Sequence, residues 1–198
     1  MRLILASGSP RRKEILEDLG YNFTIRTAGF DESAVSLERP AEGVQALALG
    51  KANAAAEDTF VAEKTVFVGS DTVVVLDDAV MGKPADEDEA FAMLRALSGR
   101  THVVCTGVAI VEKDEKNEVV ENETFVEQTE VTFFDLSDEE IRAYIATKEP
   151  MDKAGAYGIQ GQGCLLVEGI RGDYLTVVGL PAARLSRRLK ARGIVPNV

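Results

Sequence analysis

The sequence predicts an α/β protein with a mixed twisted sheet and flanking helices. Apolar, β-branched runs at 66–76 and 102–111 indicate buried strands. The stretch 40–58 instead repeats apolar residues at helical spacing, which indicates an amphipathic helix. Strand and helix signals alternate along the 198 residues, and no repeat, Gly/Ser linker or low-complexity tract divides them. We therefore expect one domain spanning 1–198.

Composition limits the classes of partner. The chain has 22 Lys and Arg against 33 Asp and Glu, a formal charge of −11, which argues against non-specific binding to nucleic acid or anionic membranes. Its start lacks a signal peptide and no apolar run reaches membrane-spanning length, so we expect a cytoplasmic protein. Cys105 and Cys164 have no metal-ligand spacing and are expected to be buried reduced thiols.

The first candidate site follows a short apolar run at Leu3–Ala6, which predicts a strand. The next residues are Ser7-Gly8-Ser9-Pro10-Arg11-Arg12, in which Ser9 is suited to an N-cap and Pro10 to the first helical position. A strand that leads through Ser and Gly into a helix start can bind an anion, with two arginines adding charge. An ordinary capped helix with solvated arginines is the alternative.

The second helix, from Pro40 to about Asp58, carries one conspicuous charge. Lys51 is seven residues after Val44 and so projects from the same, apolar face. Its side chain either passes the edge of the core into solvent or reaches into a cleft towards an anion. Before this helix a strand is expected at Phe23–Thr27, and the pair Asp31-Glu32 alone indicates a solvated loop.

The stretch Val66–Leu76 contains a polar centre, Gly69-Ser70-Asp71-Thr72, between apolar flanks. A carboxylate inside a buried strand must be paired, hydrogen-bonded or bound to a metal, because burying it alone is costly. A turn between two short strands explains the same residues. On this stretch alone the two interpretations are equally supported.

The remaining elements follow from local signals. Asp77-Asp78 indicates a hairpin turn, and Lys83, before Pro84, is expected at a strand end or in a loop. His102 is expected to be structural, because no nucleophile or second ligand accompanies it. The pattern further predicts helices from Asp86 and Ser137 and at the C-terminus, and strands at 102–111, Val119–Phe134, Leu165–Val167 and Tyr174–Val178.

The segment Glu149–Gly163 contains four glycines, which make a regular helix or strand improbable along its whole length. Its glycines let a ligand approach the backbone, and Asp152, Lys153 and Gln160 offer polar groups. A flexible surface loop is the alternative.

Taken in order, these segments resemble the Maf family of nucleoside triphosphate pyrophosphatases over nearly the whole chain. The resemblance implies an α/β fold with two lobes around a central cleft, like that of inosine triphosphate pyrophosphatases. It also implies hydrolysis of a nucleoside triphosphate to the monophosphate and pyrophosphate, a divalent cation (Mg, Mn or Co) and a homodimer. The motifs that carry the resemblance are 5–12, Asp31-Glu32, Lys51-Ala52, 69–72, Gly82-Lys83-Pro84, 97–99, 149–155, 157–161 and 172–181.

The same resemblance implies roles for individual residues. Asp71 matches the general base and Glu32 an acidic residue of the same site, suited to a hard cation. Whether Asp71 takes a proton or holds the metal stays open. The phosphate-handling positions are matched by Ser7, Arg12, Lys51 and Lys83.

Three further positions match the branch of the family that acts on dTTP and UTP: Arg11, Thr72 and Gln160. The Ser-Pro-Trp-Arg pattern of the 7-methyl-GTP branch is absent. A Gln amide offers a donor and an acceptor, which suits the edge of uracil or thymine. The resemblance also implies that modified pyrimidine nucleotides are substrates. It further implies a role in house-cleaning of nucleotide pools and a link to cell-division arrest. The alternatives are a nucleotide-binding regulator without turnover and a purine-directed pyrophosphatase.

Overall fold

The computed structural model describes residues 1–197, which form two compact units. The first contains Met1–Asp71, Thr106–Glu127 and the C-terminal segment from Gly179. The second contains Thr72–Cys105 and Gln128–Val178. Three long strands contribute residues to both units, so each unit is built from separate stretches of sequence.

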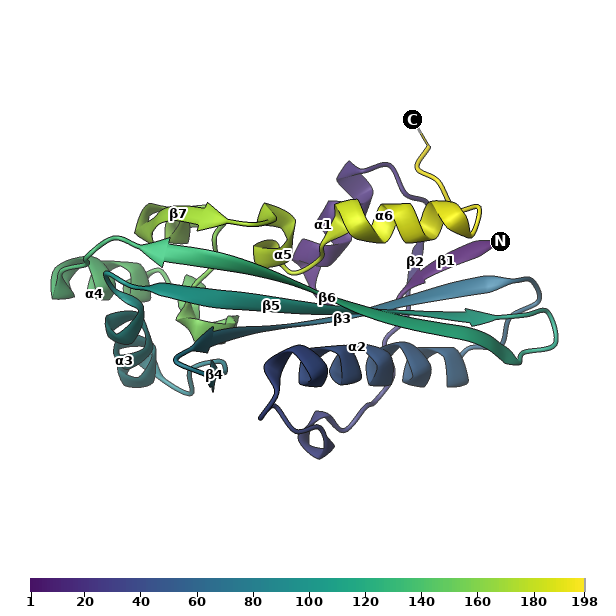
Figure 1. Ribbon diagram of the computed structural model, residues 1–198, viewed down its shortest axis with the longest axis horizontal. Helices are drawn as coiled ribbons and strands as arrows, with labels where there is room; N and C mark the ends of the chain where they lie inside the picture. Colours follow the sequence, from purple (N-terminus) through teal and green to yellow (C-terminus); the bar gives the residue numbers. More distant parts are fainter. Residues whose placement is uncertain (198) are drawn as a thin grey trace. The chain divides into compact units, whose positions relative to one another are not determined.

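The strands form the mixed sheet that the sequence predicts, in the order β2-β1-β3-β5-β6-β7, with β4 paired to β3 (Figure 1). β1 is parallel to β2 and β3, whereas the β3–β4 and β6–β7 pairs are antiparallel. Helices accompany the sheet, so the predicted mixed α/β class is confirmed. The strands are β1 (Arg2–Leu5), β2 (Thr24–Ile25), β3 (Thr65–Leu76), β4 (Ala79–Met81), β5 (Thr101–Lys113), β6 (Val119–Phe133) and β7 (Val167–Arg171). The helices are α1 (Pro10–Asp18), α2 (Pro40–Glu57), α3 (Glu87–Leu97), α4 (Asp138–Ala146), α5 (Tyr174–Val178) and α6 (Ala182–Ala191).

β3 passes through the polar centre without a break, so the interpretation of a turn at 69–72 is wrong. Ser70 is fully buried, and the side chain of Asp71 is mostly buried within the strand. The turn comes later, at Asp77 and Asp78, both of which have positive φ angles (49° and 64°). The apolar flanks keep the strand in the core, and the polar residues are carried within it.

In the first unit the sheet lies between α2 on one face and α1 and α6 on the other (Figure 1). Small residues let α2 approach the sheet closely. A Cβ on Gly107 would lie 2.4 Å from the carbonyl oxygen of Val44, and the buried alanines of α2 pack with Phe67 of β3. The resulting core includes Ile4, Ala48, Ala52, Ala55, Phe67, Ala109 and Val111.

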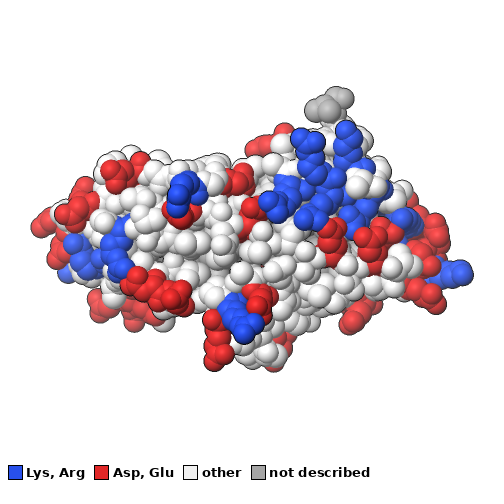
Figure 2. All heavy atoms as spheres, in the orientation of Figure 1, with Lys and Arg blue, Asp and Glu red and all other residues white. Residues whose placement is uncertain are grey.

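Basic side chains gather over α6 (Figure 2). Several of them are paired. Arg192 is 2.5 Å from Glu121 and 3.0 Å from Glu123 of β6, while Arg188 and Arg184 pair with Glu123 and Glu127. The basic helix therefore neutralises part of the acidic hairpin formed by β5 and β6.

In the second unit both predicted helix starts are confirmed. Asp86 caps α3 by accepting a hydrogen bond from the backbone N–H of Glu89. Ser137 and Glu140 form a complete capping box at the start of α4. His102 is buried against Phe133 and Tyr157, as expected of a structural histidine. The core of the unit includes Val74, Leu94, Leu97, Phe133, Ile141, Tyr144 and Tyr157.

Two strand predictions are wrong. Residues 165 and 166 close a 3₁₀ helix (Gly161–Leu166), and the strand begins only at Val167. Tyr174–Val178 forms α5 rather than a strand. There the side chain of Asp173 accepts hydrogen bonds from the backbone N–H and the hydroxyl of Thr176, both at 2.7 Å, and this local cap overrides the β preference of the segment.

The cysteine prediction is half right. Cys105 is buried, and burial raises the pKa of its thiol above the usual value, whereas Cys164 is exposed. Neither forms a disulfide. None of the helices within residues 1–197 has the length and apolar character needed to cross a membrane.

Candidate active site

The site is organised by the alternation of side chains along β3. Gly69 and Asp71 are two residues apart and therefore face the same side of the strand, the side covered by α2. A Cβ on Gly69 would lie 2.1 Å from the carbonyl oxygen of Ala48, so only glycine allows α2 to come this close. The close approach brings the turn of α2 that contains Lys51 alongside Asp71.

Lys51 holds two carboxylates. Its Nζ lies 2.5 Å from Asp71 Oδ1 and 3.1 Å from Glu32 Oε1. The Lys51 and Asp71 side chains are only 20% and 14% exposed, so water screens this pair less than a surface ion pair. Of the two alternatives for Lys51, the reach towards charged groups is the one observed.

Glu32 is fixed by the turn in which it lies. Residues Glu32–Ala34 form a short 3₁₀ helix, whose N-cap Asp31 accepts hydrogen bonds from the N–H and the hydroxyl of Ser33 at 3.0 and 2.6 Å. These bonds lower the pKa of the Asp31 carboxyl from its usual value. The acidic pair is thus an ordered turn in which Asp31 caps and Glu32 reaches Lys51.

Arg12, near the start of α1, is held by two acceptors. Its Nε donates to the carbonyl oxygen of Gly179 at 2.8 Å, and its Nη1 donates to Ser7 Oγ at 3.1 Å. Ser70, on the opposite side of β3 from Asp71, donates to the same Gly179 carbonyl at 3.0 Å. The backbone of Gly179 therefore ties α1 to β3 and fixes the direction of the guanidinium.

Burial lowers the pKa of Arg12 to about 10, and the negative charge of Asp71 partly opposes that shift. Arg11 lowers it further and Glu32 raises it, so all three charges act on this guanidinium. Arg12 is still charged at neutral pH. A desolvated cation of this kind gains from binding an anion, because the anion replaces the lost hydration.

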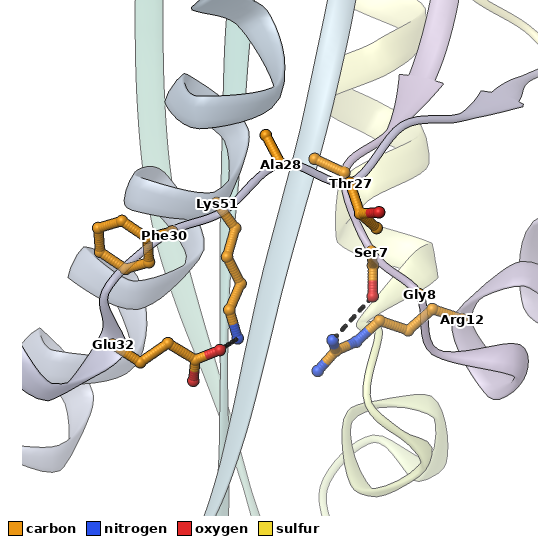
Figure 3. Close-up of a pocket in the computed structure, with 9 residues that line it drawn as sticks. Ser7, Gly8, Arg12, Thr27, Ala28, Phe30, Glu32 and Lys51 are labelled. Atoms are coloured by element: carbon orange, nitrogen blue, oxygen red, sulfur yellow. Dashed lines mark hydrogen bonds and ion pairs between the residues drawn. The ribbon is translucent and has the colours of Figure 1, made fainter. Parts of the chain in front are cut away.

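These groups line a pocket of about 230 Å³ in the first unit. In Figure 3, Lys51 and Glu32 point towards each other on one side of β3. Arg12 and Ser7 point towards each other on the other side. The pocket combines two cations, a carboxylate and two hydroxyl residues, a donor-rich set suited to phosphate oxygens. Its lining consists of Ala6, Ser7, Gly8, Arg12, Thr27, Ala28, Phe30, Glu32 and Lys51.

The predicted site residues divide between the two units. Ser7, Arg11, Arg12, Glu32, Lys51 and Asp71 all lie in the first unit. The other four each interact with Arg12 or Lys51, through a hydrogen bond, an ion pair or their charge. Thr72, Lys83 and Gln160 belong to the second unit. There Lys83 and Gln160 are exposed, and Thr72 is half-buried in β3 directly after Asp71.

Sequence reasoning gave no role to several residues that build the site. Gly179 binds Arg12 through its carbonyl oxygen, and any residue type has that group, so its identity signals nothing. Phe30 lines the pocket by lying against Gly50, where a Cβ would be 2.1 Å from its ring. The Gly50–Phe30 contact joins residues twenty apart that no single-element periodicity connects.

Comparison with known proteins gives close relatives. A dTTP/UTP pyrophosphatase of Bacillus cytotoxicus is 51% identical over 189 residues, which cover 96% of this chain and 94% of that protein. Proteins of the same name from Bacillus cereus and Bacillus thuringiensis subsp. konkukian are 51% and 50% identical with the same coverage. A dITP/XTP pyrophosphatase structure from Mycobacterium abscessus aligns over 98% of this chain and 95% of that one, at 13% identity. Its TM-score of 0.42 does not establish a shared fold.

The comparison with family models covers almost the whole chain. Residues 2–192 match the model described as Maf-like protein. The match includes every residue of the phosphate-suited pocket and both carboxylates on Lys51. This chain belongs to the Maf family.

Proposed function

We propose that this chain hydrolyses dTTP and UTP to the nucleoside monophosphate and pyrophosphate. The observation that carries the proposal is the pocket lined by Arg12, Lys51 and Glu32, with Asp71 paired to Lys51. The chain is also about half identical to proteins named dTTP/UTP pyrophosphatase. Cations that neutralise phosphate charge and a carboxylate that handles water are the groups such a reaction needs.

The pocket is suited to the phosphate part of the substrate. Its volume of about 230 Å³ is below the roughly 300–1,000 Å³ typical of pockets that enclose a whole small ligand. We assign Ser7, Arg11, Arg12 and Lys51 to the phosphates, and Lys83 of the second unit to the same task. Arg12 is pre-oriented by Ser7 and Gly179, which reduces the ordering that binding would require.

Asp71 is the proposed catalytic residue. In the free protein its carboxylate is bound to Lys51, and an arriving phosphate competes for the same ammonium. Asp71 then orients a water molecule or takes its proton. The water oxygen forms a bond to the α-phosphorus, the bond from that phosphorus to the α–β bridging oxygen breaks, and pyrophosphate leaves with the electron pair of that bond.

Glu32 and Asp71 also fit a divalent cation. Their carboxylates converge on one ammonium, which shows that both reach a common positive charge. Within residues 1–197 no three His, Cys, Asp or Glu side chains come together to hold a metal by themselves. Mg²⁺ characteristically uses one or two carboxylates together with substrate phosphates, so the pair is sufficient. A bound Mg, Mn or Co ion would supply further neutralisation of phosphate charge.

Base selection is assigned to Arg11, Thr72 and Gln160, the positions that match the dTTP and UTP branch of the family. Gln160 is exposed in the glycine-rich segment of the second unit and so is accessible to a ligand.

We further propose that the two units act as one domain and that the protein is a cytoplasmic homodimer. Its role would be to clear dTTP, UTP and modified pyrimidine nucleotides from the nucleotide pool, with a link to cell-division arrest. The family resemblance supports each of these.

The test is pyrophosphate release from a panel of dTTP, UTP, 5-methyl-UTP, dGTP, ITP and 7-methyl-GTP, with and without a divalent metal. We expect the pyrimidine nucleotides to be hydrolysed fastest, and only with metal. Faster turnover of ITP or 7-methyl-GTP would contradict the pyrimidine assignment. Tight binding of dTTP without pyrophosphate release would instead identify a nucleotide-binding regulator.

A further inference from the structure

The glycine-rich segment that carries Gln160 is fastened by two side chains of the second unit. The Glu149 carboxylate accepts hydrogen bonds from the backbone N–H groups of Gln162, at 3.1 Å, and Gly163, at 3.3 Å. The Tyr144 hydroxyl donates to the same carboxylate at 3.2 Å and accepts from the N–H of Gly158, also at 3.2 Å. Glu149 and Tyr144 thus hold the loop on both sides of Gln160.

Glu149 performs the capping that Gln160 does not. Gln160 is the N-cap residue of the 3₁₀ helix Gly161–Leu166, and its side chain makes no capping hydrogen bond. The first N–H groups of any helix lack partners within the helix and need an acceptor from elsewhere. Here the acceptor is the carboxylate of Glu149, at the start of the same glycine-rich segment, so the amide of Gln160 is not used in capping.

Two glycines of the loop leave room for the Glu149 and Tyr144 side chains. Gly161 has a φ of +64°, and a Cβ there would lie 2.8 and 2.9 Å from the two oxygens of Glu149. A Cβ on Gly163 would lie 2.6 Å from the Tyr144 hydroxyl. Glycine at both positions is therefore explained by the close wrapping of the backbone around this carboxylate and this phenol.

We propose that Glu149, supported by Tyr144, is a positioning residue for substrate specificity, which holds the loop 158–163 so that Gln160 presents its amide to the pyrimidine edge. The inference rests on the proposed function, and it adds a residue that acts through the backbone of the loop. Desolvation by burial raises the pKa of Tyr144 above its usual value, so the phenol remains a donor at neutral and moderately alkaline pH.

The test is the variant Glu149→Gln, which keeps the shape of the side chain and places an NH₂ group opposite a backbone N–H. Glu168→Gln, an exposed position in β7 of the same unit, removes the same charge and serves as the control. We expect the preference for dTTP over dGTP, as a ratio of kcat/KM, to fall roughly tenfold in Glu149→Gln. The loss should come through KM for dTTP, with kcat little changed, and Glu168→Gln should behave as the unchanged protein.

Tyr144→Phe gives a second measurement if Glu149→Gln folds poorly, because it removes only the hydroxyl. It should lower the same ratio by a smaller factor. Hydrogen exchange of the Gln162 and Gly163 amides should become faster in Glu149→Gln, which tests the hydrogen bonds without any substrate.

The outcomes separate the two proposals. An unchanged protein that shows no preference for dTTP and UTP would overturn the proposed function and this inference together. A preference for dTTP that is present in the unchanged protein and equally strong in Glu149→Gln and Tyr144→Phe would overturn the inference alone. Equal loss of activity towards every nucleotide, with the ratio intact, would likewise overturn it, because that result indicates a purely structural role.

Discussion

Lys51 Nζ lies 2.5 Å from Asp71 Oδ1, an ion pair between α2 and β3. The two elements come this close because Gly69 of β3 packs against the backbone of Ala48 in α2. Glu32 completes the cluster at 3.1 Å from the same ammonium. Two negative charges on one positive charge leave a net charge of about −1, which the nearby Arg12 offsets. The arrangement allows a phosphate and a cation to enter without leaving any of these charges unpaired.

Asp71→Asn should lower kcat for dTTP by about 10²–10⁴-fold, the usual contribution of a positioned acid–base group. The free energy of unfolding should change little, because Lys51 keeps its pair with Glu32. Steady-state pyrophosphate release and urea denaturation measure the two effects. Asp78→Asn, in the exposed hairpin turn, makes the same chemical change and should leave both values unaltered. Near-normal hydrolysis by Asp71→Asn would refute its assignment as the catalytic residue.

Arg12→Lys should reduce kcat/KM by roughly 10–100-fold, although the charge is kept. A lysine ammonium cannot reproduce the fork that reaches both Gly179 and Ser7, and a hydrogen bond to a charged group is worth about 1.5–3 kcal/mol. Arg26→Lys, at an exposed position in the same unit, is the matched control. Kinetics with dTTP check the prediction, and equal values for the two variants would show that the fork geometry is unimportant.

The fold was predictable wherever a local signal decided the structure. Ser137 and Glu140 lie three residues apart and bind each other's backbone, so the start of α4 is visible in the sequence. The failure at Tyr174–Val178 has the opposite origin. Its β-branched residues favour a strand, whereas the hydrogen bonds from Thr176 to the Asp173 carboxylate stabilise the helix that forms.

The site was predictable to the extent that chemistry is carried by side-chain type. Lys51 could be placed on the apolar face of α2 from its spacing to Val44, and in the structure its ammonium pairs with two carboxylates. The anchor of Arg12 could not be found in this way. It is the carbonyl oxygen of Gly179, which is 167 positions away and which every residue type possesses.

Gly69→Ala should destabilise the protein by about 1–3 kcal/mol, the usual cost of overpacking. The new methyl group would lie 2.1 Å from the carbonyl oxygen of Ala48, so α2 must move away from β3. That movement separates Lys51 from Asp71, and kcat/KM should fall more than the folded fraction does. Gly169→Ala is the control, since a Cβ there has nothing within 4 Å. A Gly69→Ala protein with unchanged unfolding and activity would contradict the close packing of α2 on β3.

His102 should make stability depend on pH below neutrality. Its Nε2 is 2.7 Å from the Tyr157 hydroxyl, and within residues 1–197 its Nδ1 is buried without a hydrogen-bond partner. Burial lowers its pKa from the usual 6.5 to about 4. As pH falls from 6.5 towards 4 the unfolded chain takes up a proton that the folded protein does not, so the contribution to stability is full above pH 6.5 and is lost within this window.

The size of the effect follows from the difference in pKa. Between pH 7.5 and pH 5 this single group should reduce the free energy of unfolding by about 2 kcal/mol, at 1.36 kcal/mol per pKa unit. Many carboxylates also titrate in acid, so the measurement compares urea denaturation of the unchanged protein with that of His102→Gln. The variant should be less stable at pH 7.5, because Tyr157 loses its imidazole partner, but it should lose about 2 kcal/mol less on acidification. Parallel losses in the two proteins would mean that His102 takes up its proton equally in the folded and unfolded states, and that the buried imidazole is not the source of the pH dependence.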